Sequence, residues 1–324
     1  MSSKLDKLIT DFLQDLEVAK GRTERTIRNY DFYLRRFSGW LKSSNITTPE
    51  KISLDAVRLF RLWLNRFKDP KTKESLQKNT QNYHLIAIRS FLKYLAKRDI
   101  SSLAPEKVEL ARLQMRHVGF LEGSDLYNLL DAPLKSKNPK IIQFRDKAIL
   151  ELFFSTGMRV SELASLKKDL NIKKTEFSIR GKGGKIRVAF LSNQARYWIQ
   201  EYRKLRKDKN LFLFIGHDKA AEARNNSTAE EKDFIGLTPR SLERIVKKYA
   251  QLVGINQSVT PHTMRHSFAT DLLMNGADIR SVQSILGHSS ITTTQIYTHI
   301  TNQQLRDVHK AFHNKRKPLS KKNK

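Results

Sequence analysis

The sequence predicts a mainly helical protein of two domains with one small antiparallel sheet, an α+β fold. Apolar residues recur at helical spacing over most of the chain. Two short apolar segments, "TEFSIR" and "IRVAFL", flank the glycine-rich stretch "GKGGK", which is typical of a hairpin. The chain has 324 residues, which is enough for two domains that each bury a core.

The first hundred residues are expected to form four helices. Apolar side chains recur at helical spacing in four stretches: Leu5 to Leu16, Ile27 to Leu41, Val57 to Phe67 and Leu85 to Leu95. The segments "KSSNITTPE" and "KDPKTKES" between them have the composition of loops. We therefore place a helical domain at residues 1–104. A linker over the surface follows at 105–118, where "APEKVELARLQMRHV" is basic and weakly periodic.

The second domain is placed at residues 119–313. Helices are expected in "EGSDLYNLLDAP" and in "IIQFRDKAILELFFSTG", where Gly157 ends the second of them. The hairpin comes next. After it, the segment 216–236 is polar and predicts a long mobile loop. The last residues, 314–324, predict a disordered basic tail.

Three helices are expected to close this domain. Two of them begin with a Thr-Pro pair, in which the threonine caps the helix and the proline takes its first position. These pairs start at Thr238 and Thr260. The third helix runs from Asp278 to Leu286 and stops at Gly287.

The charge of the chain indicates a polyanionic partner. It has 61 Lys and Arg against 32 Asp and Glu, a formal net charge of +29. Nucleic acid is the leading partner, and a solubility or ribosome-associated surface is the alternative. Basic residues on the polar faces of the first four helices are candidates for phosphate contacts: Arg22, Arg25, Arg28, Arg35, Arg36, Lys78, Arg89 and Lys93.

The chain contains no cysteine, which excludes disulfides and thiolate metal sites and fits a reducing compartment. Its N-terminal segment lacks the apolar core of a signal peptide. No run approaches the roughly 20 apolar residues of a membrane span. We therefore expect a soluble intracellular protein with no membrane partner.

The stretch "TPHTMRH" concentrates polar groups at the start of a helix. His262 and His266 have the i, i+4 spacing of a zinc helix, but Thr263 stands where a metalloprotease has its glutamate, and no third ligand is evident. His262 and Arg265 share a helix face, where an imidazole and a guanidinium can grip one phosphate. A polar surface face is the alternative for that pair.

Other residues of suitable chemistry follow chain reversals. Arg159 comes just after Gly157 in "STGMRVSELASL", and Lys182 and Lys185 lie in the hairpin turn. His288 follows the helix-ending Gly287, and Tyr297 comes nine residues later. Each signal is weak alone, because turn lysines are usually solvated and a tyrosine on a short helix is usually half-buried.

In this order the residues resemble the tyrosine recombinase, or phage-integrase-type, family, most closely its Xer-like two-domain members. The resemblance covers nearly the whole chain and implies an N-terminal helical, SAM-like core-binding domain followed by a catalytic domain. It assigns the catalytic set to Arg159, Lys182, His262, Arg265, His288 and Tyr297. His266 is expected to pack or orient. The loop at 216–236 is longer than in compact members.

The resemblance also implies the chemistry. Tyr297 is the nucleophile, and because its unperturbed pKa is near ~10 it needs surrounding cations to attack phosphorus at neutral pH. The arginines neutralise the phosphorane, the His262 position is the general base, and the Lys182 position protonates the leaving 5′-oxygen. The products are a 3′-phosphotyrosyl link and a free 5′-hydroxyl. No metal or nucleotide cofactor is expected.

The implied partner is double-stranded DNA at a recombination site, bound by a homo-tetramer or a hetero-tetramer with a second recombinase that proceeds through a Holliday junction. The terminal segment "TNQQLRDVHKAFH" would dock into a neighbouring subunit. A cytoplasmic, nucleoid-associated location follows. Type IB topoisomerase activity and a non-catalytic DNA-binding relative are the alternatives, and the role is open between chromosome-dimer resolution and mobile-element integration.

Overall fold

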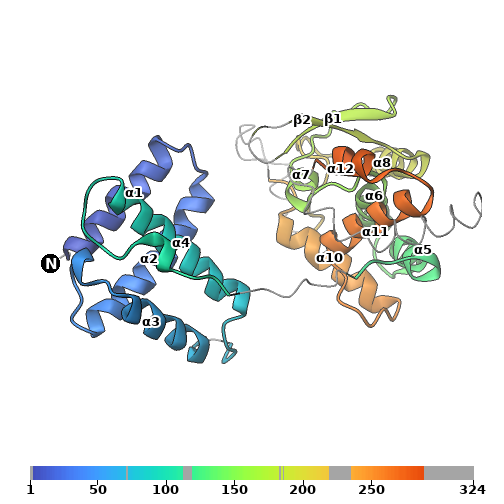
Figure 1. Cartoon of the computed structure of the whole chain (residues 1–324). Coiled ribbons are helices and arrows are strands. Elements are labelled where there is room, and N and C mark those ends of the chain that lie inside the picture. Colours follow the sequence, from blue (N-terminus) through green and yellow to red (C-terminus); the bar gives the residue numbers. More distant parts are fainter. Residues whose placement is uncertain are drawn as a thin grey trace, which may run out of the picture. The chain divides into compact units, whose positions relative to one another are not determined.

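The computed structural model describes residues 3–70, 72–111, 119–181, 184, 186–218 and 235–287. The chain divides into two compact units, Met1–Arg116 and His117–Lys324. Figure 1 shows helices in both units and the hairpin formed by β1 and β2. The α+β class with a small antiparallel sheet, predicted from the sequence, is confirmed.

The described residues of the first unit form the four α-helices expected from the apolar spacing. These are α1 (Lys4–Val18), α2 (Glu24–Ser43), α3 (Leu54–Arg66) and α4 (Lys78–Ala96). Their apolar stripes meet in one core, in which Phe12, Phe37, Phe60 and Phe91 are almost completely buried. Tilted ring pairs join neighbouring helices there, with centroids 5.7 Å apart for Phe12 and Phe91 and 4.9 Å apart for Phe37 and Phe60.

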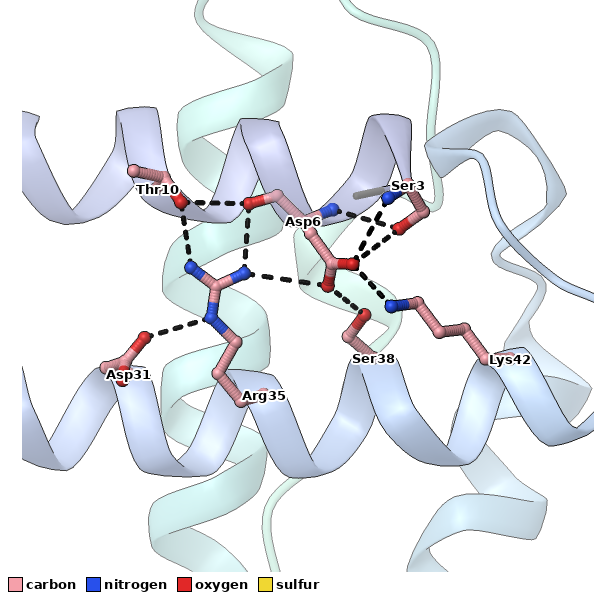
Figure 2. A network of polar contacts seen from close by, with 7 residues as sticks. All are labelled: Ser3, Asp6, Thr10, Asp31, Arg35, Ser38 and Lys42. Atoms are coloured by element: carbon pink, nitrogen blue, oxygen red, sulfur yellow. Dashed lines mark hydrogen bonds and ion pairs between the residues drawn. The ribbon is translucent and has the colours of Figure 1, made fainter. Parts of the chain in front are cut away.

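A cluster of polar contacts joins the first turn of α1 to α2, and Figure 2 shows it from close by. The Asp6 carboxylate accepts hydrogen bonds from Ser38 Oγ (2.7 Å), from Ser3 Oγ (2.9 Å) and from Lys42 Nζ. Arg35 Nη1 donates to the Asp6 carbonyl oxygen at 3.0 Å. Burial alone would raise the pKa of Asp6, but the hydrogen bonds from Lys42, Ser38 and Ser3 outweigh it and hold the pKa far below the usual range. We refer to these contacts as the Asp6 network.

The start of the predicted linker packs onto the first unit. Residues Pro105–Lys107 form a short 3₁₀ helix, and Val108 is 1% exposed in the core. The Asn82 side chain pairs with Ala111 in both directions, donating from Nδ2 to the carbonyl oxygen (2.9 Å) and accepting from the amide (3.0 Å). Residues 105–111 therefore differ from the surface linker predicted at 105–118, because an apolar side chain and a backbone pair fix them.

The described residues of the second unit are mostly helical. Its helices are α5 (Gly123–Asp131), α6 (Lys140–Thr156), α7 (Val160–Ala164), α8 (Asn193–Leu205), α10 (Pro239–Leu252), α11 (Pro261–Met274) and α12 (Ile279–Leu286). Helix α6 runs through the core and packs against α8 and α11. The hairpin pairs β1 (Glu176–Arg180) with β2 (Ile186–Phe190), and α12 lies beside β2 (Figure 1).

Helix ends follow the predicted signals. The Thr238 and Thr260 side chains cap α10 and α11, and Asp278 caps α12. Gly157 and Gly287 end α6 and α12 with φ of 56° and 65°, in the left-handed region that glycine tolerates. These signals predicted each boundary because a cap or a left-handed residue acts locally.

Helix α8 was not predicted. Its stretch "NQARYWIQEYRKL" buries Ala195, Ile199 and Tyr202, and Ser192 Oγ caps it by accepting from the Ala195 amide at 3.1 Å. Only two of these three buried residues are large, so the apolar stripe is hard to see among polar neighbours.

Several predicted features lie outside the described residues: the hairpin turn lysines, most of the loop at 216–236, and everything after Gly287, including the terminal segment and the basic tail. Among the helices that the structure describes, none is long and apolar enough to cross a membrane.

Candidate active site

Three of the six predicted catalytic residues are described, and the structure brings them together. Arg159 precedes α7, while His262 and Arg265 lie in the first turns of α11. Arg265 and Arg159 donate to the neighbouring carbonyls of Leu286 and Gly287, and His262 lies one turn before Arg265 on α11. Lys182, His288 and Tyr297 lie outside the described residues.

Arg265 is held at both ends of its guanidinium by backbone carbonyls. Nη1 donates to Gly157 O at 2.6 Å, and Nη2 donates to Leu286 O at 2.7 Å. The residue is 4% exposed. A Cβ at Gly157 would stand 2.4 Å from Phe268 Cδ1, so only glycine allows this turn beside the arginine. The ends of α6 and α12 therefore fix the position of Arg265.

Each terminal nitrogen of the Arg159 guanidinium has a hydrogen-bond partner in the protein, and the side chain stays partly accessible to solvent. Nη1 forms an ion pair with Glu162 Oε1 at 2.9 Å, and Nη2 donates to Gly287 O at 3.3 Å. Its side chain is 32% exposed, against 4% for Glu162. A guanidinium held in this way keeps donors for a ligand while its orientation is fixed.

Glu162 was not predicted as a site residue. Its Oε2 accepts from the Arg159 amide at 2.8 Å and from Arg187 Nη2 at 3.0 Å. Burial would raise the pKa of Glu162, but the hydrogen bonds from Arg159 and the charge of Arg187 outweigh it and lower the pKa. The spacing from Arg159 to a glutamate three residues later is the signal that could have found it, because such a glutamate caps a helix.

Arg187 also joins the site without having been predicted. It lies on β2 with a side chain that is 9% exposed, and Nη1 donates to Ile285 O at 2.8 Å. An arginine in an alternating strand carries no signal of its own. Only the fold shows that β2 lies beside the end of α12.

Both histidines are electrostatically disfavoured as cations. Partial burial of the ring lowers the pKa of His262, and the charges of Arg265 and Arg159 lower it further, although the side chain remains partly exposed. Burial, with His262 and Arg265, lowers the pKa of His266 to about 4. At neutral pH both imidazoles are therefore neutral. Among the described residues, no group of three His, Asp or Glu could hold a metal ion.

Two fixed guanidinium groups beside a neutral imidazole can bind a phosphate diester and accept a proton. The charge of the arginines complements the non-bridging oxygens, and a neutral imidazole can accept a proton. This chemistry is what the described part of the site supplies by itself.

Two family descriptions match this chain. Residues 120–304 match the Phage integrase family, and residues 9–99 match the N-terminal SAM-like domain of phage integrases. Each match falls within one of the two units.

Curated relatives match over nearly the full length. "Tyrosine recombinase XerC" of Thermodesulfovibrio yellowstonii is 35% identical over 315 residues, covering 97% of each chain. "Tyrosine recombinase XerD" of Listeria innocua is 35% identical over 319 residues, covering 95% of this chain and 99% of the relative.

Solved structures share the fold. XerH recombinase bound to its difH substrate in a pre-cleavage complex aligns with a TM-score of 0.65 at 21% identity, covering 93% of this chain and 84% of that chain. A lambda integrase (75–356) dimer bound to a COC′ core site aligns with a TM-score of 0.66 at 15% identity, covering 89% of this chain and 96% of that chain.

Proposed function

Because the chain belongs to the phage integrase family, we propose that it is a site-specific recombinase that cuts and rejoins double-stranded DNA through a 3′-phosphotyrosyl intermediate. The family and the enzyme class, a tyrosine recombinase, agree with what the order of six residues predicts, and both are confirmed. Because the relatives carry recombinase names, a topoisomerase is not favoured.

One observation carries the proposed chemistry. The guanidinium groups of Arg159 and Arg265 are anchored on neighbouring carbonyls, Gly287 O and Leu286 O, beside the neutral ring of His262. Two preorganised positive charges next to a base provide what a phosphodiester needs when its phosphorus becomes pentacoordinate.

We assign the steps as follows. The Tyr297 oxygen attacks phosphorus as His262 accepts the phenolic proton, while Arg159 and Arg265 stabilise the charge on the non-bridging oxygens. The bond from phosphorus to the 5′-oxygen breaks, and Lys182 gives that oxygen a proton. His288 completes the set around the phosphate. A second strand's 5′-hydroxyl can then reverse the step and release Tyr297.

The proposed partner is a DNA recombination site, bound by four subunits that are either copies of this chain or a mixture with a second recombinase. Two solved relatives support a DNA partner, because one is titled as bound to its substrate and the other as a dimer on a core site. The terminal segment is proposed to join subunits. We propose a cytoplasmic, nucleoid-associated location and a role in chromosome-dimer resolution or mobile-element integration.

The test is a covalent trap. Wild-type protein expressed in its own cells should carry covalently bound DNA, and sequencing that DNA identifies the site. A nicked duplex with this sequence should then form a covalent adduct with wild type and none with Tyr297→Phe, which keeps the ring and removes only the nucleophilic oxygen. DNA binding should be equal in both. An adduct that persists in Tyr297→Phe would overturn the assignment of the nucleophile.

A further inference from the structure

The last two carbonyls of α12 and the carbonyl of its capping glycine each accept a hydrogen bond from a different arginine. Ile285 O accepts from Arg187 (2.8 Å), Leu286 O from Arg265 (2.7 Å) and Gly287 O from Arg159 (3.3 Å). These three arginines come from three different elements of the chain. Carbonyls at a helix C-terminus lack partners within the helix and carry a partial negative charge, so they attract cations.

Arg187 is the member of this group that nothing in the proposed chemistry uses. Its guanidinium is forked, with Nη1 on Ile285 O and Nη2 on Glu162 Oε2 at 3.0 Å. Glu162 in turn holds Arg159 through Oε1 at 2.9 Å. One buried side chain on β2 thus links Arg159 to the end of α12.

The aliphatic stem of Arg187 also touches that end directly. A Cβ placed at Gly287 would lie 2.8 Å from Arg187 Cδ, and Gly287 has a φ of +65°. The arginine therefore lies against the residue that precedes His288 in the chain. Its strand is also the one that follows the glycine-rich turn with Lys182.

We infer that Arg187 is a positioning residue of the active site, which fixes Arg159 through Glu162 and fixes the end of α12 through Ile285. This inference rests on the proposed function, since it presumes that Arg159 contacts the scissile phosphate. Arg187 touches no reacting atom. The role requires both hydrogen bonds of the Arg187 guanidinium. One reaches the Glu162 carboxylate that orients Arg159, and the other reaches the end of α12, whose next two carbonyls bind Arg265 and Arg159.

An ordinary structural arginine would stabilise the fold without being coupled to Glu162 in the reaction. A positioning residue predicts more. Arg187→Gln should slow covalent cleavage about 10- to 100-fold, the size expected when a charge-assisted hydrogen bond is lost from a transition state. Arg187→Lys keeps the charge but cannot reach both acceptors at once, so its rate should fall between those of wild type and Arg187→Gln.

The decisive readout is a double-mutant cycle with Glu162. Because Arg187 acts in part through Glu162, replacing Arg187 by Gln in the Glu162→Gln variant should slow cleavage clearly less than the same replacement slows the wild-type protein. Two independent structural roles would instead multiply the two losses. Arg180→Gln is the matched control, because Arg180 is an exposed arginine on the partner strand of the same hairpin. It should cleave within about twofold of wild type.

The assay uses the full chain at saturating concentration on a nicked duplex whose sequence comes from the covalently trapped DNA. At saturation, differences in DNA affinity do not enter the cleavage rate. A cleavage rate of Arg187→Gln within twofold of wild type would overturn the inference, and so would single losses that multiply in the double variant. In either case a covalent adduct of the wild-type protein would still support the proposed function. If Arg187→Gln does not fold, Arg187→Lys decides, since a wild-type rate there contradicts the need for two anchors. Failure of wild type to form any adduct would overturn the proposed function and this inference with it.

Discussion

Each unit contains a carboxylate that is largely removed from solvent and paired with an arginine of similar exposure, but the remaining contacts of the two arginines differ. Arg35, 38% exposed, lies 3.5 Å from Asp6, and Arg159, 32% exposed, lies 2.9 Å from Glu162. The other donors of Arg35 reach Thr10 and Asp31 on the same two helices, so the network closes on itself (Figure 2).

The other donors of Arg159 lead elsewhere. Nη2 reaches the end of α12 at Gly287, and the charge of Arg159 acts on His262 together with that of Arg265. The Arg159–Glu162 pair therefore adjoins a second cation and a base, which is the setting that its proposed positioning role requires. Where all partners belong to two packed helices, the same pair only stabilises their contact.

Replacing each arginine in turn should give the largest difference between the two pairs. Arg159→Ala should lower the rate of covalent cleavage about 100- to 1000-fold, because it deletes one preorganised donor from the transition state. Arg35→Ala should leave the rate of the bound complex within about twofold and lower the free energy of unfolding by about 1 kcal/mol. Single-turnover cleavage and urea unfolding measure the two effects.

These variants are matched in exposure and in the kind of partner they lose. Equal losses of cleavage in both would mean that the Asp6 network also positions groups for the reaction. A wild-type rate in Arg159→Ala would remove it from the site.

A substrate with a bridging sulfur separates the proposed role of Lys182 from those of Arg159 and Arg265. Lys182→Ala should slow cleavage of the normal substrate about 100-fold, since an alkoxide needs a proton to leave. With sulfur in place of the 5′-bridging oxygen, the leaving thiolate has a conjugate acid with pKa near ~8.5 and departs unprotonated, so much of the rate should return. Arg159→Ala and Arg265→Ala should show no such rescue, because these arginines contact the non-bridging oxygens of the phosphate, which the sulfur substitution leaves unchanged.

Lys185→Ala is the control for this assignment, since both lysines belong to "GKGGK". Rescue of Lys185→Ala alone would move the general acid by three residues. Rescue of neither would place the proton donor elsewhere, with His262 the first group to test.

Sequence alone predicted the helices whose buried faces are large and regular, and it predicted their ends. Leu85, Ile88, Leu92 and Leu95 of α4 are almost completely buried, so their spacing carries the signal. Helix α8 was missed because its buried face mixes small and polar-tipped residues. Val108 could not be foreseen in the first core, because a single apolar residue in a basic stretch has no period.

The site residues also fall into those with a local sequence signal and those without one. Arg159, His262 and Arg265 follow local signals, a glycine turn and a capped helix start, and the structure brings them together. Glu162 has a local signal, since it follows Arg159 by three residues at the start of α7. Arg187 had none, because its role depends on β2 lying beside α12, which is a property of the tertiary fold.

The Asp6 network predicts a smaller effect that appears in stability and depends on pH. Asp6→Asn should lower the free energy of unfolding by about 1–2 kcal/mol at pH 7, because the hydrogen bonds from Ser38 and Lys42 lose their charged acceptor. The folded pKa of Asp6 is depressed, so its contribution is complete above the unfolded value of 3.8 and is lost as the pH falls toward the folded value. The gap between wild type and variant should therefore be constant from pH 7 to about 5 and shrink below about pH 4.

Urea unfolding of the full chain carrying Trp198→Phe measures this gap by fluorescence, because the two remaining tryptophans, Trp40 and Trp63, lie in the first unit. Cleavage at pH 7 should stay within about twofold of wild type. A gap that grew at low pH would mean that the protonated side chain, and not the carboxylate, makes the stabilising contacts.

The smallest effect concerns the base itself. His262 accepts a proton only when neutral, so the cleavage rate should fall as the pH drops through its pKa, which lies below the ordinary 6.5. Burial, Arg265 and Arg159 lower that pKa, and Glu243 on α10 opposes them. Glu243→Gln should therefore lower the pKa of His262 and move the acid limb of the pH–rate profile to lower pH at low salt. The shift should fade at high salt because Glu243 is exposed to solvent. Glu201→Gln on α8 is the control, since Glu201 forms its ion pair with Lys204 and is not among the charged groups that act on His262. A limb that moves to higher pH, or that moves equally in both variants, would show that the titrating base is a different group.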